Sequence, residues 1–174
     1  RLEQNLDWLS KHGFHYIRAL GVVGDYANAD FWDGREIDWH WSDYDQVIAG
    51  LTDLAYQKYG MRVEWTLIGD GQKNIPSSSD RQALADRFVA MSLGREQEIL
   101  HFEVANEAWQ NGFEGASGQT ELRDLTQYLT GKTSIFRSPS GMSNGIKFDA
   151  TGNMIVAEGA DFGGRRVTRT DMKT

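Results

Sequence analysis

Three strand-like stretches, with one helix-like stretch in each interval, most constrain what this chain can fold into. Apolar residues favour strands over 14–20, 61–68 and 99–104. Parallel strands need a crossover connection, and each interval here is long enough to hold a helical one. The pattern therefore predicts an α/β fold with a parallel sheet of partial (β/α)-barrel type.

Helix signals accompany these strands. A leucine repeat over 2–9 predicts a helix ahead of the first strand. The run Ser-Asp-Tyr-Asp at 42–45 is typical of a helix start, and apolar residues at helical spacing continue this helix to Gly60. Ser79 and Gln82 form a second capping pattern ahead of another amphipathic stretch.

The sequence changes character near residue 130. All six tryptophans precede it, and the first 129 residues carry 11 basic and 21 acidic side chains, against 7 and 4 in the last 45. Short strands are predicted over 146–149 and 154–157, around a turn, and over 165–170. We therefore expect a partial barrel region over 1–129 and a short antiparallel β segment over 130–174.

Length and composition exclude several classes. With 174 residues the chain is too short for a complete (β/α)₈ barrel, which takes about 250. The absence of cysteine excludes disulfides and thiolate sites, and the net charge of −7 argues against a nucleic-acid partner. No apolar run approaches the roughly 18 residues of a membrane span. A fusion of two partial folds leaves unpaired strand edges, which a homo-oligomer would cover.

The run His-Phe-Glu-Val-Ala-Asn-Glu-Ala-Trp at 101–109 carries the sharpest chemical signal. A hydrophobic strand ends in Asn106 and Glu107, and the carboxyl ends of strands form the active-site face of parallel barrels. A glutamate there can act as a general acid, and the Asn106 amide can hydrogen-bond a sugar hydroxyl. Trp109 can stack on a pyranose ring. The alternative is an ordinary loop after a buried strand, with Glu107 in solvent.

This context, together with Phe-His-Tyr-Ile-Arg at 14–18, resembles clan A of the glycoside hydrolases. These are retaining (β/α)₈ enzymes such as cellulases, mannanases and β-galactosidases. The resemblance covers residues 1–129 and implies hydrolysis of β-glycosidic bonds, a carbohydrate partner and no cofactor. It implies that Glu107 is the acid/base, that Asn106 binds substrate and that Arg18 orients the nucleophile. An arginine on a strand can also simply pair with Asp or Glu.

The family's second catalytic carboxylate has no match in this sequence. Retaining hydrolysis uses two carboxyl groups about 5–5.5 Å apart. In the family the nucleophile lies at the end of strand seven, whereas this chain matches strands two to four only. We therefore expect the chain to lack glycosidase turnover on its own. A recombined or chimeric module without catalytic activity is a further hypothesis.

The last 45 residues carry a different signal. Small residues and Asn144-Gly145 precede a short strand, and Gly-Arg-Arg-Val-Thr-Arg follows at 164–169. Together these features of 131–174 resemble the gluconolactonase/regucalcin-like family, six-bladed propellers that hydrolyse sugar lactones with a divalent metal. The resemblance implies a sugar-lactone hydrolase that uses calcium or zinc, with Asn144 at the metal site. The alternative is that Asn144 and Gly145 only form a turn that needs positive φ.

An acidic, tryptophan-rich stretch over 30–41 offers a weaker candidate. It includes Trp32 as a candidate substrate contact. The stretch could bind sugar or calcium, or be a solvated connection packed by its own aromatic residues. The four histidines show no metal-ligand spacing, so each is predicted to be structural or solvent-facing.

Overall fold

The chain divides into two compact units, Arg1–Thr133 and Ser134–Thr174. The composition change near residue 130 lies close to this division. The computed structural model describes residues 1–24, 34–71, 74–130, 145–148, 151, 153–157 and 166–170.

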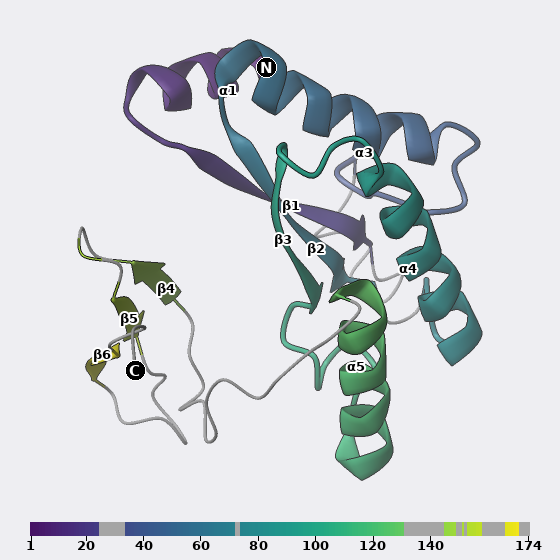
Figure 1. Cartoon of the computed structure of the whole chain (residues 1–174). Helices are drawn as coiled ribbons and strands as arrows, with labels where there is room; N and C mark the ends of the chain where they lie inside the picture. Colours follow the sequence, from purple (N-terminus) through teal and green to yellow (C-terminus); the bar gives the residue numbers. More distant parts are fainter. Residues whose placement is uncertain are drawn as a thin grey trace. The chain divides into compact units, whose positions relative to one another are not determined.

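Helices and parallel strands alternate in the first unit, as the sequence predicts (Figure 1). The elements in chain order are α1 (Leu2–Lys11), β1 (Tyr16–Val23), α3 (Tyr44–Asp53), the π-helical η2 (Leu54–Lys58), β2 (Arg62–Asp70), α4 (Ser78–Ser92), β3 (Ile99–Ala105) and α5 (Gly115–Thr130). The strands pair in parallel in the order β1-β2-β3. The predicted α/β class is therefore confirmed, and the described strands of this unit form a sheet rather than a closed barrel.

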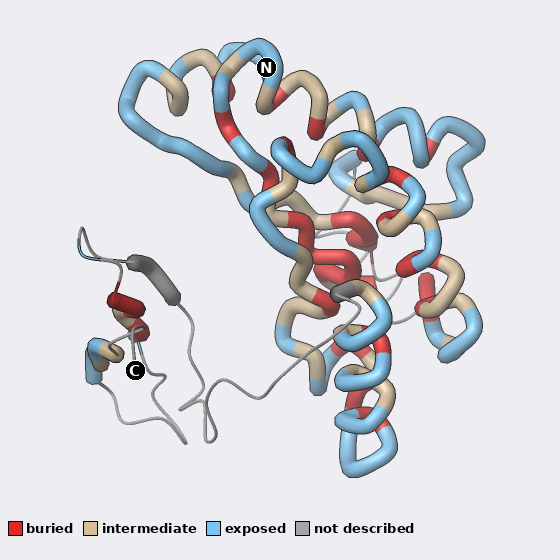
Figure 2. Tube along the Cα trace, in the orientation of Figure 1, coloured by how far each residue is buried: buried red, intermediate tan, exposed pale blue. Residues whose placement is uncertain are grey.

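One face of this sheet is apolar and packs against helices. Val63 and Trp65 of β2 are buried in a single core with Ile48 of α3 and Phe88 of α4. The Phe88 ring meets Trp65 edge-on, with the ring centroids 5.5 Å apart. Figure 2 shows the buried residues gathered along the middle of the sheet and on the inner sides of these helices. Burial of these large side chains holds α3 and α4 on the sheet.

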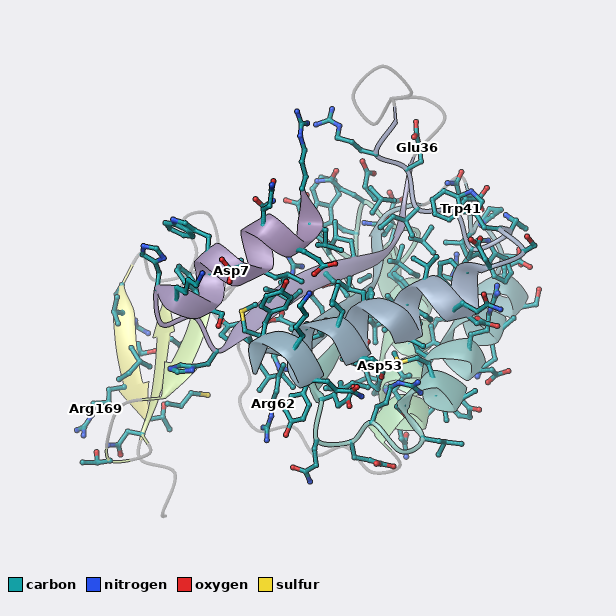
Figure 3. The ribbon with its side chains drawn as sticks, turned by 90° about the horizontal axis from the view of Figure 1, so that it is seen from above. Asp7, Glu36, Trp41, Asp53, Arg62 and Arg169 are labelled. Atoms are coloured by element: carbon teal, nitrogen blue, oxygen red, sulfur yellow. The ribbon has the colours of Figure 1, made fainter. Side chains whose placement is uncertain are left out.

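A buried hydroxyl fixes α3 against β2. Trp65 Nε1 donates to Thr52 Oγ1 at 3.0 Å, and the Thr52 hydroxyl donates to the Ile48 carbonyl oxygen at 2.8 Å. Asp53, at the end of α3 (Figure 3), accepts a hydrogen bond of 2.6 Å from Arg95 Nε. The last residue of α3 is thus tied by an ion pair to the segment between α4 and β3.

Helix boundaries differ from the sequence prediction in three places. The cap of α4 is Ser77 rather than Ser79, because the Asp80 amide donates to Ser77 Oγ at 3.1 Å. At α3 the predicted run of 42–45 does contain the helix start, at Tyr44, but the side-chain capping bond that such a run suggests is absent. The third difference is α5, which the sequence analysis did not predict. It begins at Gly115 with a positive φ of 64° and lacks the polar capping residue on which such predictions rely.

The second unit contains the expected short strands. β4 (Gly145–Phe148), β5 (Met154–Ala157) and β6 (Val167–Thr170) form an antiparallel sheet in that order. Met154 and Val156 of β5 are buried and Ile155 between them is less so, which is the alternation of a sheet with one covered face. Across the described residues of both units, no helix has the length and apolar character needed to cross a membrane.

Candidate functional site

The sheet face opposite the apolar core carries polar and charged side chains at matching positions. The strand register aligns Arg18 with Glu64 and Glu64 with His101. One step further along the same face, Thr66 lies beside Glu103. Side chains two residues apart on a strand share a face, so these residues form one continuous polar surface.

Arg18 is the centre of this surface. Its Nε donates to Thr66 Oγ1 at 3.0 Å, and its Nη2 donates to Asn106 Oδ1 at 3.1 Å and to the Glu103 carboxylate. Thr66 donates to the same Glu103 oxygen at 2.5 Å. We call Arg18, Thr66, Glu103 and Asn106 the Arg18 cluster. It brings two of the three predicted catalytic-site residues, Arg18 and Asn106, into direct contact.

Two more charged groups flank the cluster. Glu64 Oε1 lies 3.6 Å from Arg18 Nε and 3.4 Å from His101 Nε2. Thr66 is fully buried beneath these side chains, whereas the Arg18, Glu103 and His101 side chains remain 41%, 38% and 54% exposed. The polar surface therefore has a buried base and a solvent-accessible top, as a binding surface requires.

Asn106 also ties the end of β3 to the end of β2. Its backbone N–H donates to the Ile68 carbonyl at 2.9 Å, one residue beyond the strand. Its own carbonyl accepts a hydrogen bond of 2.6 Å from Asn111 Nδ2, and Asn111 Oδ1 accepts one of 3.1 Å from the Gly71 amide. Asn111 is only 2% exposed. The loop after β3 is thus anchored to the carboxyl end of the neighbouring strand.

Glu107 follows in an unusual backbone conformation. Its φ of 40° makes it the one non-glycine residue with positive φ in the described part of the chain. The side chain is exposed, and its Oε2 accepts a hydrogen bond of 2.9 Å from Gln110 Nε2. The Gln110 amide also donates to the Glu107 carbonyl at 2.7 Å, which closes a turn. The third predicted catalytic residue is therefore adjacent to the Arg18 cluster along the chain but pairs with Gln110.

The other predicted contacts have different outcomes. Trp109 lies in the same loop and is 62% exposed, so its ring is accessible. Trp32 lies outside the residues that the structure describes, as does Asn144, the candidate metal ligand. Among the described residues, no group of three or more His, Asp or Glu side chains could hold a metal ion.

Sequence reasoning missed Glu103, Thr66, Glu64 and His101. A signal for them existed, because the apolar residues of 61–68 alternate with polar ones, and the same alternation recurs from His101 to Glu103. Polar side chains on every second position of adjacent strands indicate a sheet face that is not part of the core.

A hollow between α4 and α5 has a volume of about 1050 Å³. Its wall includes Arg81, whose side chain is only 6% exposed and donates to both carboxylate oxygens of Glu121, at 2.7 and 2.8 Å. The guanidinium also lies 5.1 Å from the Phe113 ring centroid. These bonds lower the pKa of Glu121. Because the buried cation is already neutralised, its role here is structural.

No family model, curated protein or solved structure matches this chain. Because a fold class does not fix an activity, the residues of the site are the basis for any functional assignment.

Proposed function

We propose that the first unit supplies the acid/base part of a glycoside hydrolase site and binds a β-linked saccharide at the carboxyl end of its parallel sheet. Glu107 is the acid/base residue in this proposal, and Asn106 and Trp109 contact the saccharide. The proposal extends the clan A resemblance of residues 1–129.

The observation that carries it is the conformation of the Asn106–Glu107 pair. Asn106 is held by Arg18 from another strand, and Glu107 next to it has a φ of 40°. A left-handed conformation costs about 1–2 kcal/mol for a residue with a Cβ, and such strain is concentrated at functional sites. The pair lies at the carboxyl end of the parallel sheet, where α/β barrels place their catalytic groups.

Each residue has a chemical role in this proposal. The Glu107 carboxyl would protonate the departing glycosidic oxygen while a second carboxylate, supplied from outside the described residues, bonds the anomeric carbon. The Glu107 carboxylate would then take a proton from the water that displaces this second carboxylate. Because Arg18 donates to Asn106 Oδ1, the Asn106 Nδ2 is the end of the amide that can donate to a sugar hydroxyl. The exposed Trp109 ring provides an apolar face for a pyranose ring.

The reaction needs a second carboxylate that none of the described residues matches. A retaining mechanism places it about 5–5.5 Å from the acid/base. We therefore expect the chain by itself to bind saccharides without turning them over.

Calorimetric titration with β-linked oligosaccharides of glucose, mannose and galactose tests the binding part. We expect at least one of them to bind, and Trp109→Ala and Asn106→Ala to weaken that binding by about tenfold or more, which corresponds to about 1.4 kcal/mol. Trp8→Ala is the matched control, since Trp8 is also exposed but lies in α1, ahead of the first strand. Binding that Trp109→Ala leaves unchanged would contradict the proposed site.

An activated aryl β-glycoside tests the acid/base role. We expect no turnover by the chain alone. If turnover is measured, Glu107→Gln must lower it strongly, because the amide cannot take the proton from the attacking water even when the activated leaving group needs no acid. Turnover that Glu107→Gln leaves unchanged would remove Glu107 from the mechanism.

A further inference from the structure

The outer edge of β3 has no strand partner among the described residues, whereas the outer edge of β1 is covered at its carboxyl end. β3 is the last strand in the order β1-β2-β3, and no other described strand pairs with it. At the other edge, Val23 exchanges two backbone hydrogen bonds with Ile37, of 3.0 and 2.9 Å, which cover the end of β1. An open strand edge presents unpaired N–H and C=O groups to another strand.

Backbone alternation shows which residues of β3 face outward. The Asn106 N–H donates to Ile68 of the β2 segment. Backbone groups alternate in direction along a strand, so Val104 and Phe102 also face β2. The N–H and C=O groups of His101 and Glu103 therefore point to the open edge.

The side chains along this edge have a self-complementary order. From 100 to 104 the sequence is Leu-His-Phe-Glu-Val, with an apolar residue at each end and opposite charges on either side of Phe102. We infer that β3 pairs antiparallel with β3 of a second copy of this chain, about a twofold axis at Phe102. His101 then lies opposite Glu103 of the partner subunit, and Glu103 lies opposite the partner's His101.

Charge selects this register from its neighbours. In an antiparallel pair, the residues whose backbone N–H and C=O groups point to the open edge must lie opposite each other. The twofold axis can therefore pass through a residue of β3 but not between two residues. An axis at His101 places two histidines opposite each other, and an axis at Glu103 places two carboxylates opposite each other. Like charges directly opposite destabilise a pair of strands, whereas opposite charges stabilise it. Only the axis at Phe102 gives two complementary pairs.

The groups that would pair still have capacity to bond. Both hydrogen bonds to the Glu103 carboxylate fall on Oε2, which leaves Oε1 to accept from the partner's imidazole. His101 contacts Glu64 through Nε2, which leaves Nδ1 on the other side of the ring. The two side chains are 38% and 54% exposed. Neither needs to break its own contacts to reach across the edge.

The apolar face of the strand is complementary as well. Phe102 lies beside its own symmetry mate. Because Phe102 packs against the apolar core of its own chain, the pair extends that core across the axis.

The resulting assembly is a six-stranded sheet with one antiparallel pair at its centre. Mixed sheets of this kind are common in α/β proteins. Because one strand pair is a small interface, the dimer is expected to be weak and to form as concentration rises.

Sedimentation of the full chain over a range of concentrations tests the dimer. We expect the mass to rise from 19.6 kDa towards twice that value. His101→Glu places a carboxylate opposite the partner's Glu103 twice, so it should weaken dimerisation by at least about tenfold. His15→Glu makes the same charge change near the start of β1 and should dimerise like the parent. A parent that stays monomeric, or a His101→Glu variant that dimerises equally well, would overturn the inference.

Introduced cysteines test the register directly, since the chain has none of its own. An equal mixture of His101→Cys and Glu103→Cys chains should form a disulfide-linked pair, because opposite residues in a hydrogen-bonded pair have Cα atoms about 5.5 Å apart. Each variant alone should remain uncrosslinked under the same mild oxidation. Circular dichroism confirms that both variants are folded. Crosslinking of either variant with itself, or none in the mixture, would overturn the register.

Discussion

Arg18 and Asn106 are 88 residues apart in the chain, yet a hydrogen bond of 3.1 Å joins the Arg18 Nη2 to the Asn106 Oδ1. The same guanidinium bonds Thr66 on the neighbouring strand β2 and Glu103 on β3, one strand further along the sheet. The parallel register of β1, β2 and β3 therefore determines how the side chain that precedes Glu107 is oriented.

Replacing Arg18 by methionine should lower the free energy of unfolding by about 1–2 kcal/mol, because Glu103 loses its cation and the Asn106 oxygen loses a donor. Arg18→Lys retains the charge without the planar fork, so its loss should be intermediate. Urea unfolding followed by circular dichroism measures all three proteins. Equal stability of the parent and Arg18→Met would show that the cluster does not stabilise the fold.

The three parallel strands of the first unit were predictable because apolar runs mark them directly, and each was placed within a few residues. Helix ends were harder. Ser77 and Ser79 are both acceptable caps by residue type, and only the Asp80 amide shows which one is used. α5 begins at a glycine with positive φ, which sequence patterns associate with turns and helix ends rather than starts.

The candidate site was predictable in part. Asn106, Glu107 and Trp109 follow one strand, so their proximity is local. The contact between Arg18 and Asn106 depends on strand register, which no local pattern specifies. The positive φ of Glu107 depends on the turn closed by Gln110, and glutamate is not a residue type that indicates such a conformation.

Two glycines give opposite predictions for substitution by alanine. A Cβ on Gly21 of β1 would lie 2.7 Å from the Phe88 ring and 2.8 Å from the Leu67 carbonyl oxygen, so Gly21→Ala should cost about 1–3 kcal/mol. Gly50 lies within α3 and a Cβ there meets nothing within 4 Å, so Gly50→Ala should stabilise the protein by up to about 1 kcal/mol. Thermal unfolding of both variants measures the difference. A neutral Gly21→Ala would mean that the sheet and α4 can separate without loss.

Glu121 should contribute stability that depends on pH. The hydrogen bonds from Arg81 hold the pKa of Glu121 below its ordinary value, so the unfolded chain binds the proton more readily than the folded one. This stabilisation is fully present above the unfolded pKa of about 4.3 and is lost as the pH falls through the lower folded pKa.

Glu121→Gln should therefore cost about 1–3 kcal/mol at neutral pH, because the buried Arg81 loses a charged partner. The difference in unfolding free energy between parent and variant should shrink on acidification through that window. Asp53, whose pKa is lowered by its hydrogen bond with Arg95, is present in both proteins and cancels from the comparison. A difference that stays constant from neutral to acidic pH would contradict the assigned pairing.

The backbone conformation at position 107 should favour glycine over a residue that carries a Cβ. At a φ of 40° a Cβ is strained, whereas glycine adopts this region freely. Comparing Glu107→Gly with Glu107→Ala isolates this effect, because both variants lose the carboxylate and its hydrogen bond with Gln110. We expect the glycine variant to be more stable than the alanine variant by about 1 kcal/mol in urea unfolding. Equal unfolding free energies of the two variants would mean that the turn relaxes around the Cβ and that Glu107 is not strained. If glycine is the more stable, a glutamate occupies a position that glycine suits better, as expected where the side chain is needed for chemistry.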